Sequence, residues 1–138
     1  MANRPPNRLL DLVLIGIIVS GAYLAGLHWA HQQAACPASG FINCNYVLSG
    51  PGSVLADIPL PAWACFWAAT ALVWAHRRAK WVGALWIAAG AFGVIWAWGH
   101  EIHDGYLCLW CTGMQALILV ALGLFLQRMF PRIEGGQQ

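Results

Sequence analysis

The sequence has few charged residues: Asp, Glu, Lys and Arg make up 9% of its 138 residues. Soluble globular domains carry about 25% charged residues, so this chain cannot cover a water-exposed globular surface. The formal net charge of +2 is too small to indicate nucleic-acid binding. The 60% hydrophobic content excludes intrinsic disorder. The sequence also lacks the regular alternation of apolar and polar residues that is typical of a membrane barrel. The composition therefore predicts a protein embedded in lipid.

Four apolar segments are long enough to cross a bilayer, which takes roughly 17 to 25 mostly apolar residues. They cover residues of about 12–30, 59–75, 81–99 and 106–129. We therefore expect an all-α integral membrane protein that forms one domain over residues 1–138. Its four transmembrane helices would form a bundle, with a long outer loop, 31–58, between the first helix and the second.

Lys and Arg are missing from two of the connections, 31–58 and 100–105. All seven cations precede the first span, lie between the second and third, or follow the fourth: Arg4, Arg8, Arg77, Arg78, Lys80, Arg128 and Arg132. The positive-inside rule places the segments that carry Lys and Arg in the cytoplasm. The sequence thus predicts that both termini are cytoplasmic and that the two cation-free loops lie outside. The first apolar run is longer than that of a signal peptide, so we expect it to be an uncleaved span.

Four of the five cysteines fall on the predicted outer side, where disulfides form and persist. Cys36 and Cys44 lie in the long loop, and Cys108 and Cys111 form a CxxC motif at the outer end of the fourth helix. Thiols at i and i+3 share one helix face, and the positive end of a helix favours the reactive thiolate. We expect Asp104 and Gly105 to start that helix. Two such pairs can pass electrons by thiol–disulfide exchange.

Other interpretations of these residues remain open. Cys36 and Cys44 could only staple the loop, and His100 and His103 together with the CxxC could bind zinc, although we expect no metal site. Cys65, inside the second span, is typical of a small buried hydrophobic residue. A non-enzymatic membrane protein with a structural disulfide or a Cys/His metal site is therefore the alternative to an enzyme, and a stapled interaction subunit is another.

The order and spacing of the cysteines resemble those of the vitamin K epoxide reductase family, in its short bacterial form without a fused thioredoxin-like domain. Seven residues separate Cys36 from Cys44, the segment Val47-Leu48-Ser49-Gly50 follows, and Cys108-Leu109-Trp110-Cys111 opens the fourth helix. The related bacterial quinone-reducing, disulfide-forming proteins have the two pairs in the opposite order. The resemblance covers nearly the whole chain.

The resemblance implies a quinone-reducing thiol–disulfide oxidoreductase that supports disulfide bond formation. Electrons from a separate thioredoxin-like or disulfide-oxidase protein on the outer side would reach the Cys36/Cys44 pair, then Cys108 and Cys111, and finally a quinone of the menaquinone, ubiquinone or vitamin K type. By the same resemblance Cys111 faces the quinone and Cys108 exchanges with the loop pair. Which loop cysteine meets the partner stays open. The expected location is a bacterial inner membrane, with the cysteines on the periplasmic or extracellular side, in contact with lipid and not with nucleic acid.

The resemblance also assigns three further candidates to the quinone site: Ser49, Trp110 and Gln115. Two positions depart from the family pattern. Gly50 stands where the family often has Ser or Thr, with Ser49 beside it, and Gln115 stands where vertebrate members have Tyr. These departures concern hydrogen bonds to the quinone and epoxide reduction, and they leave the four cysteines in place.

Overall fold

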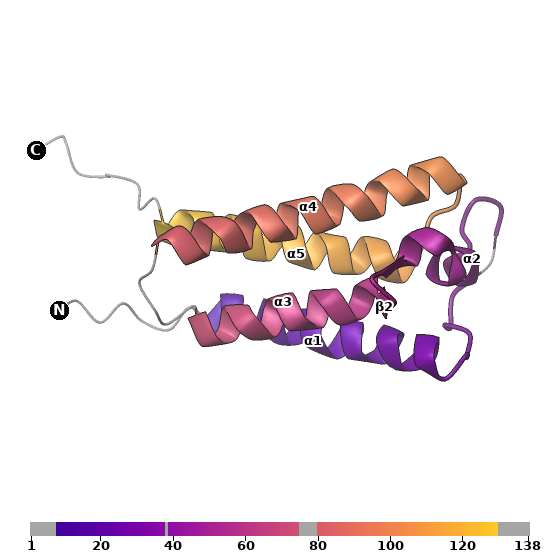
Figure 1. The fold of residues 1–138 in the computed structure, drawn as a ribbon, viewed down its shortest axis with the longest axis horizontal. Helices are drawn as coiled ribbons and strands as arrows, with labels where there is room; N and C mark the ends of the chain where they lie inside the picture. Colours follow the sequence, from indigo (N-terminus) through magenta and orange to yellow (C-terminus); the bar gives the residue numbers. More distant parts are fainter. Residues whose placement is uncertain (1–7, 38, 75–79, 130–138) are drawn as a thin grey trace, which may run out of the picture.

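The structure is a computed structural model that describes residues 8–37, 39–74 and 80–129. Long helices run side by side along the molecule, and the shorter elements gather at one end (Figure 1). The long helices match the four apolar segments of the sequence: α1 (Arg8–Trp29), α3 (Leu60–Trp74), α4 (Lys80–Asp104) and α5 (Leu109–Met129). The predicted helical fold is thereby confirmed.

Helix length distinguishes α3 from the other long helices. In the described part of the chain, α1, α4 and α5 are long and apolar enough to cross a membrane, and α3 is a shorter apolar helix of 15 residues. At 1.5 Å per residue α3 covers about 22 Å, less than the roughly 30 Å of a hydrocarbon core. The described residues therefore contain three helices of spanning length, where the sequence predicts four.

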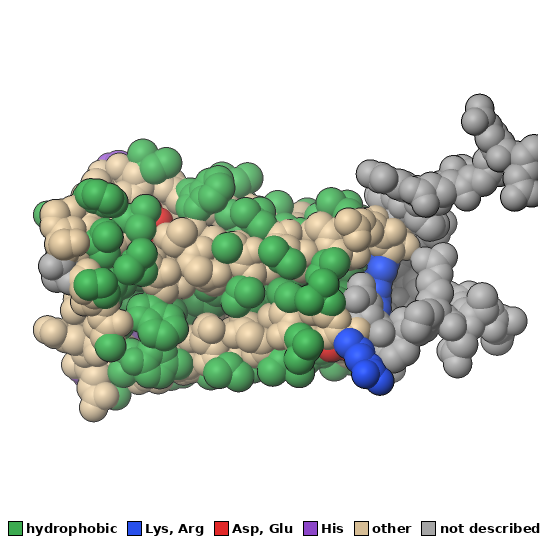
Figure 2. Space-filling view, turned by 180° about the vertical axis from the view of Figure 1, so that it is seen from behind, with side chains coloured by type: hydrophobic (Ala, Val, Ile, Leu, Met, Phe, Trp, Pro, Cys, Tyr) green, Lys and Arg blue, Asp and Glu red, His purple; other side chains and the backbone are tan. Residues whose placement is uncertain are grey.

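The described cations lie at the end of the bundle that is far from the cysteines. Arg8 begins α1 and Arg128 lies in the last turn of α5, and the blue side chains of Figure 2 lie at this end. The remaining predicted cytoplasmic arginines lie outside the described residues: Arg4, Arg77, Arg78 and Arg132. The bundle thus has a cationic end and a cysteine end.

The connection between α4 and α5 is shorter than the sequence predicts. Helix α4 continues to Asp104, and α5 begins only at Leu109. Gly105 has a φ of +72° and donates its backbone N–H to the Glu101 carbonyl at 3.1 Å. A glycine in this left-handed conformation ends a helix, so Asp104 and Gly105 terminate α4 instead of starting α5. As a result Glu101 is helical, and Cys108 directly precedes α5.

The long connection between α1 and α3 folds into a compact unit over the cysteine end. We call residues 41–59 the cap segment. It contains α2 (Cys44–Ser49), the short 3-10 helix η1 (Pro51–Ser53) and a hairpin of β1 (Val54–Leu55) with β2 (Ile58–Pro59). The Asn43 side chain caps α2 by accepting the Tyr46 N–H at 3.0 Å. The turn residues of the hairpin, Ala56 and Asp57, both have positive φ, as tight hairpin turns require.

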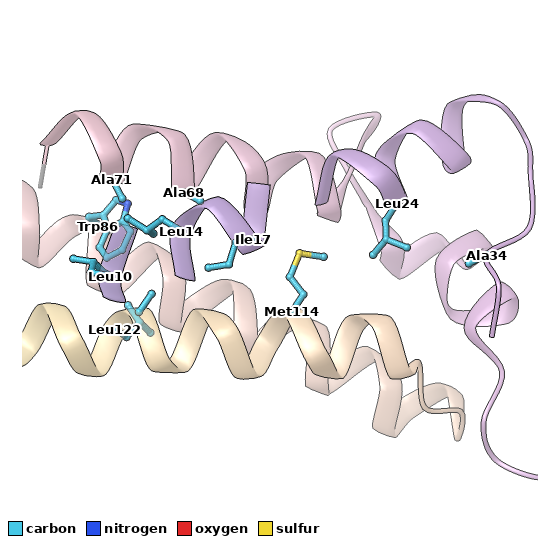
Figure 3. Close-up of a cluster of buried hydrophobic side chains, with 11 residues drawn as sticks. Leu10, Leu14, Ile17, Leu24, Ala34, Ala68, Ala71, Trp86, Met114 and Leu122 are labelled. Carbon is cyan, nitrogen blue, oxygen red and sulfur yellow. The ribbon is translucent and has the colours of Figure 1, made fainter. Parts of the chain in front are cut away.

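One buried hydrophobic cluster holds the bundle together (Figure 3). Every long helix contributes to it: Leu10, Leu14 and Ile17 from α1, Ala68 and Ala71 from α3, Trp86 from α4, and Met114 and Leu122 from α5. Helices α1 and α3 approach closely at Gly21, where an added Cβ would lie 2.7 Å from the Pro61 carbonyl oxygen. This core fixes the four long helices relative to one another, and the cap segment and the cysteines lie at one end of the bundle that they form.

Candidate redox site

Backbone hydrogen bonds clamp the cap segment to the α4–α5 connection. Ile42 forms a parallel bridge with Leu107. The Asn43 N–H donates to the Leu107 carbonyl at 3.1 Å, and the Leu107 N–H donates to the Phe41 carbonyl at 2.8 Å. The chain then runs directly into Cys44 on one side and Cys108 on the other. The clamp therefore brings together two cysteines that are far apart in the sequence.

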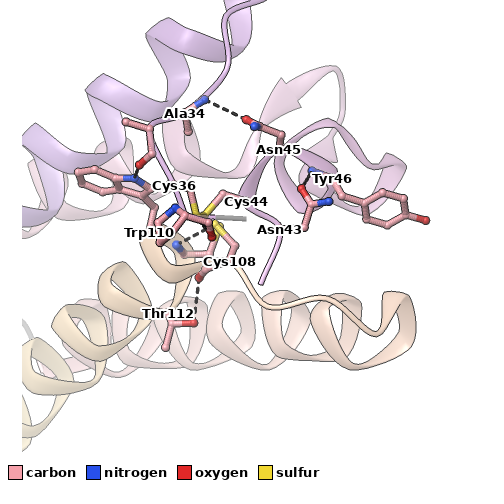
Figure 4. The surroundings of a disulfide bond; sticks show 12 residues. Ala34, Cys36, Asn43, Cys44, Asn45, Tyr46, Cys108, Trp110 and Thr112 are labelled. Carbon is pink, nitrogen blue, oxygen red and sulfur yellow. Dashed lines mark hydrogen bonds between the residues drawn. A yellow bond between two sulfur atoms is a disulfide. The ribbon is translucent and has the colours of Figure 1, made fainter. Parts of the chain in front are cut away.

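The structure brings all four predicted redox cysteines together. Cys36 and Cys44 form a disulfide with a Cα–Cα distance of 6.0 Å. Cys44 is 1% exposed and Cys108 is 0% exposed, and both belong to one buried cluster, against which Cys36 and Cys111 pack. Figure 4 shows Cys108 beside the disulfide. The two pairs thus meet through Cys44 and Cys108.

Cys108 takes the N-cap position of α5. Its Sγ accepts the Cys111 N–H at 3.2 Å, the contact by which an N-cap side chain satisfies a free helix donor. The pKa of the Cys108 thiol is lowered, first by a hydrogen bond from the Cys111 thiol, although burial and the charge of Glu101 act in the opposite direction. Cys108 and Cys111 are free thiols in this structure. Of the two, Cys108 receives the hydrogen bonds that stabilise a thiolate, from the Cys111 N–H and the Cys111 thiol.

Cys111 faces an apolar cavity between α3, α4 and α5. The cavity has a volume of about 540 Å³, within the range of about 300 to 1,000 Å³ that small-molecule sites occupy. Trp67 of α3 and Trp86 of α4 form part of its wall, with stacked rings 3.9 Å apart. Each indole N–H donates to the backbone carbonyl of the other tryptophan at 2.9 Å. The bonded pair fixes the distance between α3 and α4 along the cavity.

Two glycines of α4, Gly90 and Gly93, also border this cavity. Gly90 lies against Trp67, because an added Cβ would lie 2.5 Å from that ring. Gly93 also lines the cavity, and a Cβ added at this position would have nothing within 4 Å. The small residues therefore serve close packing at Gly90 and leave open space at Gly93.

Gln115 brings a polar group to the cavity wall, one helical turn after Cys111. Its side chain is buried, and its Nε2 donates to Oε1 of the buried Glu101 at 3.4 Å. The Gln115 Oε1 atom is buried and has no hydrogen-bond partner among the described residues. Glu101 was not among the residues that the sequence predicted for the site. The sequence placed Glu101 in the outer loop 100–105, where an acidic residue is ordinary; its place in α4, an apolar membrane helix, is what makes it a functional candidate.

The other two candidates for the quinone site lie away from this cavity. Trp110 lines a second cavity of about 360 Å³ together with Cys36 and Pro37. Its indole N–H donates to the Ala35 carbonyl at 2.9 Å, so it ties the start of α5 to the loop after α1. Ser49 is exposed on α2, and its hydroxyl donates to the Tyr46 carbonyl at 3.4 Å. The structure thus groups Gln115, but not Trp110 or Ser49, with Cys111.

The histidines near the CxxC have other neighbours. The His100 ring lies 5.3 Å from the Trp96 ring and packs over Gly52 of the cap segment. His103 Nδ1 lies 3.4 Å from the Asp104 carboxylate. Within residues 8–37, 39–74 and 80–129, no group of three or more His, Cys, Asp or Glu is arranged to hold a metal ion. Cys65 lies apart from both cysteine pairs, with its thiol donating to the Ile18 carbonyl at 3.2 Å.

The model of the Vitamin K epoxide reductase family matches residues 9–126, a range that includes all four candidate redox cysteines. The chain belongs to this family. Comparisons with curated proteins and with solved structures gave no match. Membership confirms the resemblance seen in the sequence, and it makes the chain an integral membrane oxidoreductase of the thiol–disulfide type from a family associated with quinones.

Proposed function

We propose that the protein carries two electrons from a thioredoxin-like or disulfide-oxidase partner, through Cys36/Cys44 and then Cys108/Cys111, to a quinone of the menaquinone, ubiquinone or vitamin K type. The chain would cross a bacterial inner membrane four times, and α3 would be its shortest span. Both termini would be cytoplasmic and the cysteine end would face the periplasm or exterior. The oxidised partner would then introduce disulfide bonds into other proteins.

One observation carries this proposal. Cys44 and Cys108 are buried in a single cluster, and Cys111, which packs against that cluster, also lines the apolar cavity of the bundle. Thiol–disulfide exchange needs direct contact between sulfur atoms, because it proceeds through a mixed disulfide. The packing supports a route from the cap segment into the bundle in which each sulfur is adjacent to the next.

The half-buried Cys36 is the better candidate for contact with the partner protein. It lines the smaller cavity next to Pro37 and Trp110, whereas Cys44 is almost completely buried. A partner thiolate would attack Cys36, form a mixed disulfide there and release the Cys44 thiolate. The second partner thiol would then resolve the mixed disulfide, which leaves the partner oxidised and the loop pair reduced.

The inward step would begin with Cys44. Its thiolate attacks Cys108 in a Cys108–Cys111 disulfide, which forms a Cys44–Cys108 disulfide and releases the Cys111 thiolate at the cavity. Cys36 then attacks Cys44, which restores the loop disulfide and frees Cys108. The structure contains a loop disulfide and free CxxC thiols, the state in which both electrons reside on the inner pair.

The residues around the cavity fit a quinone. The wall is mostly apolar, and the cavity runs along α3 from Leu60 to Trp74, which suits an extended prenyl tail. Cys111 and the unpartnered Gln115 Oε1 are the polar groups that could meet a quinone head group. A bound quinone would supply the two-electron acceptor. The chain's part is to hold the head group beside Cys111 and to re-form the Cys108–Cys111 disulfide.

The test uses the purified full-length protein in lipid nanodiscs with a reduced thioredoxin-like protein and ubiquinone or menaquinone. We expect quinone absorbance to fall while the partner is oxidised in equal amount. In spheroplasts, a membrane-impermeant thiol reagent should label the reduced, half-buried Cys36 without lysis. If the redox state of all four cysteines ignores quinone supply, the disulfide is structural and the proposal fails.

A further inference from the structure

Glu101 is a buried carboxylate that the electron route does not use. It is 8% exposed near the cysteine end of α4. Burial of a charged carboxylate is unfavourable unless polar groups compensate for the lost water. The described residues contain no cation paired with it, and the side chain bonded to it is that of Gln115. A group kept in such a position invites a functional explanation.

The hydrogen bond to Glu101 determines which end of the Gln115 amide faces the cavity. An ionised carboxylate only accepts hydrogen bonds, whereas an amide has a donor end and an acceptor end. The Gln115 Nε2 group therefore turns toward Glu101, and Oε1 is left buried without a partner. Gln115 and Cys111 are i and i+4 on α5, so they occupy the same helix face, and both line the cavity.

A buried acceptor in the cavity discriminates between the two redox forms of a quinone. The oxidised form offers carbonyl oxygens, which cannot donate to Gln115 Oε1. The reduced form carries two hydroxyl groups, and either could donate. A site that binds the reduced form more tightly also makes electron transfer to the bound quinone more favourable.

From these contacts we infer that Glu101 is a positioning residue, which holds the Gln115 amide so that the cavity prefers the dihydroxy form of its ligand. This inference rests on the proposed quinone function. It adds a residue outside the cavity wall that sets the redox preference of the site. Loss of one such hydrogen bond should reduce the preference by up to about fivefold, equivalent to about 1 kcal/mol. The potential of the bound quinone would fall by about 20 mV.

Binding measurements can test this without turnover. The background is full-length protein with Cys108→Ser and Cys111→Ser, which cannot exchange electrons with a ligand. Anaerobic titration with 1,4-naphthoquinone and with 1,4-naphthohydroquinone would be followed by quenching of the tryptophans around the cavity. We expect the background to bind the hydroquinone more tightly, and Glu101→Gln to reduce that preference several-fold. Asp104→Asn, which removes a neighbouring carboxylate on the same helix, should leave the preference unchanged.

A double-mutant comparison separates positioning from a general structural effect. Gln115→Leu should lose the preference, and Glu101→Gln combined with Gln115→Leu should lose no more. Glu101→Asp, which keeps the carboxylate, should retain more of the preference than Glu101→Gln and serves as the second variant if Glu101→Gln does not fold. Equal preferences in the background and Glu101→Gln, or fully additive losses in the double variant, would overturn the inference. If the background bound neither form, the proposed quinone function itself would fail.

Discussion

The two cysteine pairs are built on different supports but share one arrangement. In the loop pair, Cys36 lies in the loop after α1 and Cys44 begins the short helix α2, whereas Cys108 caps the long helix α5 and Cys111 lies in its first turn. In each pair one sulfur is buried against the other pair, namely Cys44 and Cys108. The other member lines a cavity of its own, the smaller for Cys36 and the larger for Cys111.

For the proposed relay, one buried and one cavity-lining cysteine in each pair would give electron transfer a direction. The buried members, Cys44 and Cys108, lie in one cluster, which would keep water and protein thiols away from exchange between the pairs, while the larger cavity leaves Cys111 open to small molecules. The other two cysteines face separate cavities: Cys36 faces the smaller one next to Trp110, and Cys111 faces the larger one within the bundle. Substitutions that affect only one pair should therefore separate partner oxidation from quinone reduction.

The largest effect is expected at Cys111. Its replacement by Ala removes the thiol that faces the larger cavity, so quinone reduction should fall by at least about 100-fold. The loss should be the same whether the reductant is a thioredoxin-like protein or a small dithiol. Quinone absorbance measured with each reductant provides the comparison. Substantial activity from either reductant would show that the electrons leave by another group.

Cys36→Ala should break only one half of the relay. Oxidation of the protein partner should stop, because the sulfur that it reaches is gone. A small dithiol can reduce the CxxC directly, so most of the quinone reduction driven by such a reductant should survive. If this variant folds but loses dithiol-driven activity as completely as Cys111→Ala, the loop pair belongs to the quinone site itself.

The sequence predicted the helical fold and drew attention to the two cysteine pairs for reasons that concern local patterns. Apolar runs and the distribution of Lys and Arg are properties of contiguous residues. The CxxC spacing also identifies a shared helix face without any tertiary information. The start of α5 was harder to locate, because Asp and Gly are typical of both helix starts and helix ends. The positive φ of Gly105 decides for the end of α4.

The parts that the sequence did not predict depend on contacts between distant segments. The Ile42–Leu107 bridge joins the cap segment to the start of α5, and no local pattern announces such a pairing. Trp110 belongs to the CxxC motif, yet the helix turns it toward Ala35 and away from the larger cavity. Glu101 became informative only when its bond to Gln115 was visible.

A smaller effect is expected when α2, the short helix that begins with Cys44, loses its N-cap. Asn43→Ala removes the side-chain cap of α2, a change that costs about 1 kcal/mol at typical N-caps. Because Cys44 begins this helix, partner-driven turnover should slow by about fivefold while dithiol-driven turnover stays near its original rate. Asn43→Ser keeps a capping oxygen and should restore the partner-driven rate. Equal slowing with both reductants would show that the cap segment supports the cavity and not the contact between the pairs.

The charge of Glu101 should also alter the inner pair slightly. It raises the pKa of the Cys108 thiol, against the lowering by the Cys111 hydrogen bond. Glu101→Gln removes the negative charge, so the pKa of Cys108 should fall and its thiolate should form at lower pH. Thiolate ultraviolet absorbance against pH measures this in protein that carries Cys65→Ala and Cys111→Ser, with the loop disulfide intact. A midpoint that stays in place or rises would contradict the sign of the charge effect.

The smallest effect is expected at Cys65, the cysteine outside both pairs. Its thiol donates to the Ile18 carbonyl and does not border either cavity that holds Cys36 or Cys111. Cys65→Ala should therefore leave electron transfer unchanged with both reductants and lower the unfolding free energy by about 1 kcal/mol. Gly21→Ala is the matched packing variant, because its new methyl group would press on the same α1–α3 contact. It should destabilise the protein more, by about 1 to 3 kcal/mol. The added methyl group would clash with the Pro61 backbone carbonyl, which cannot move as easily as a side chain. A loss of activity in Cys65→Ala that approached that of Cys111→Ala would add a fifth sulfur to the relay, and the symmetry between the two pairs would no longer describe it.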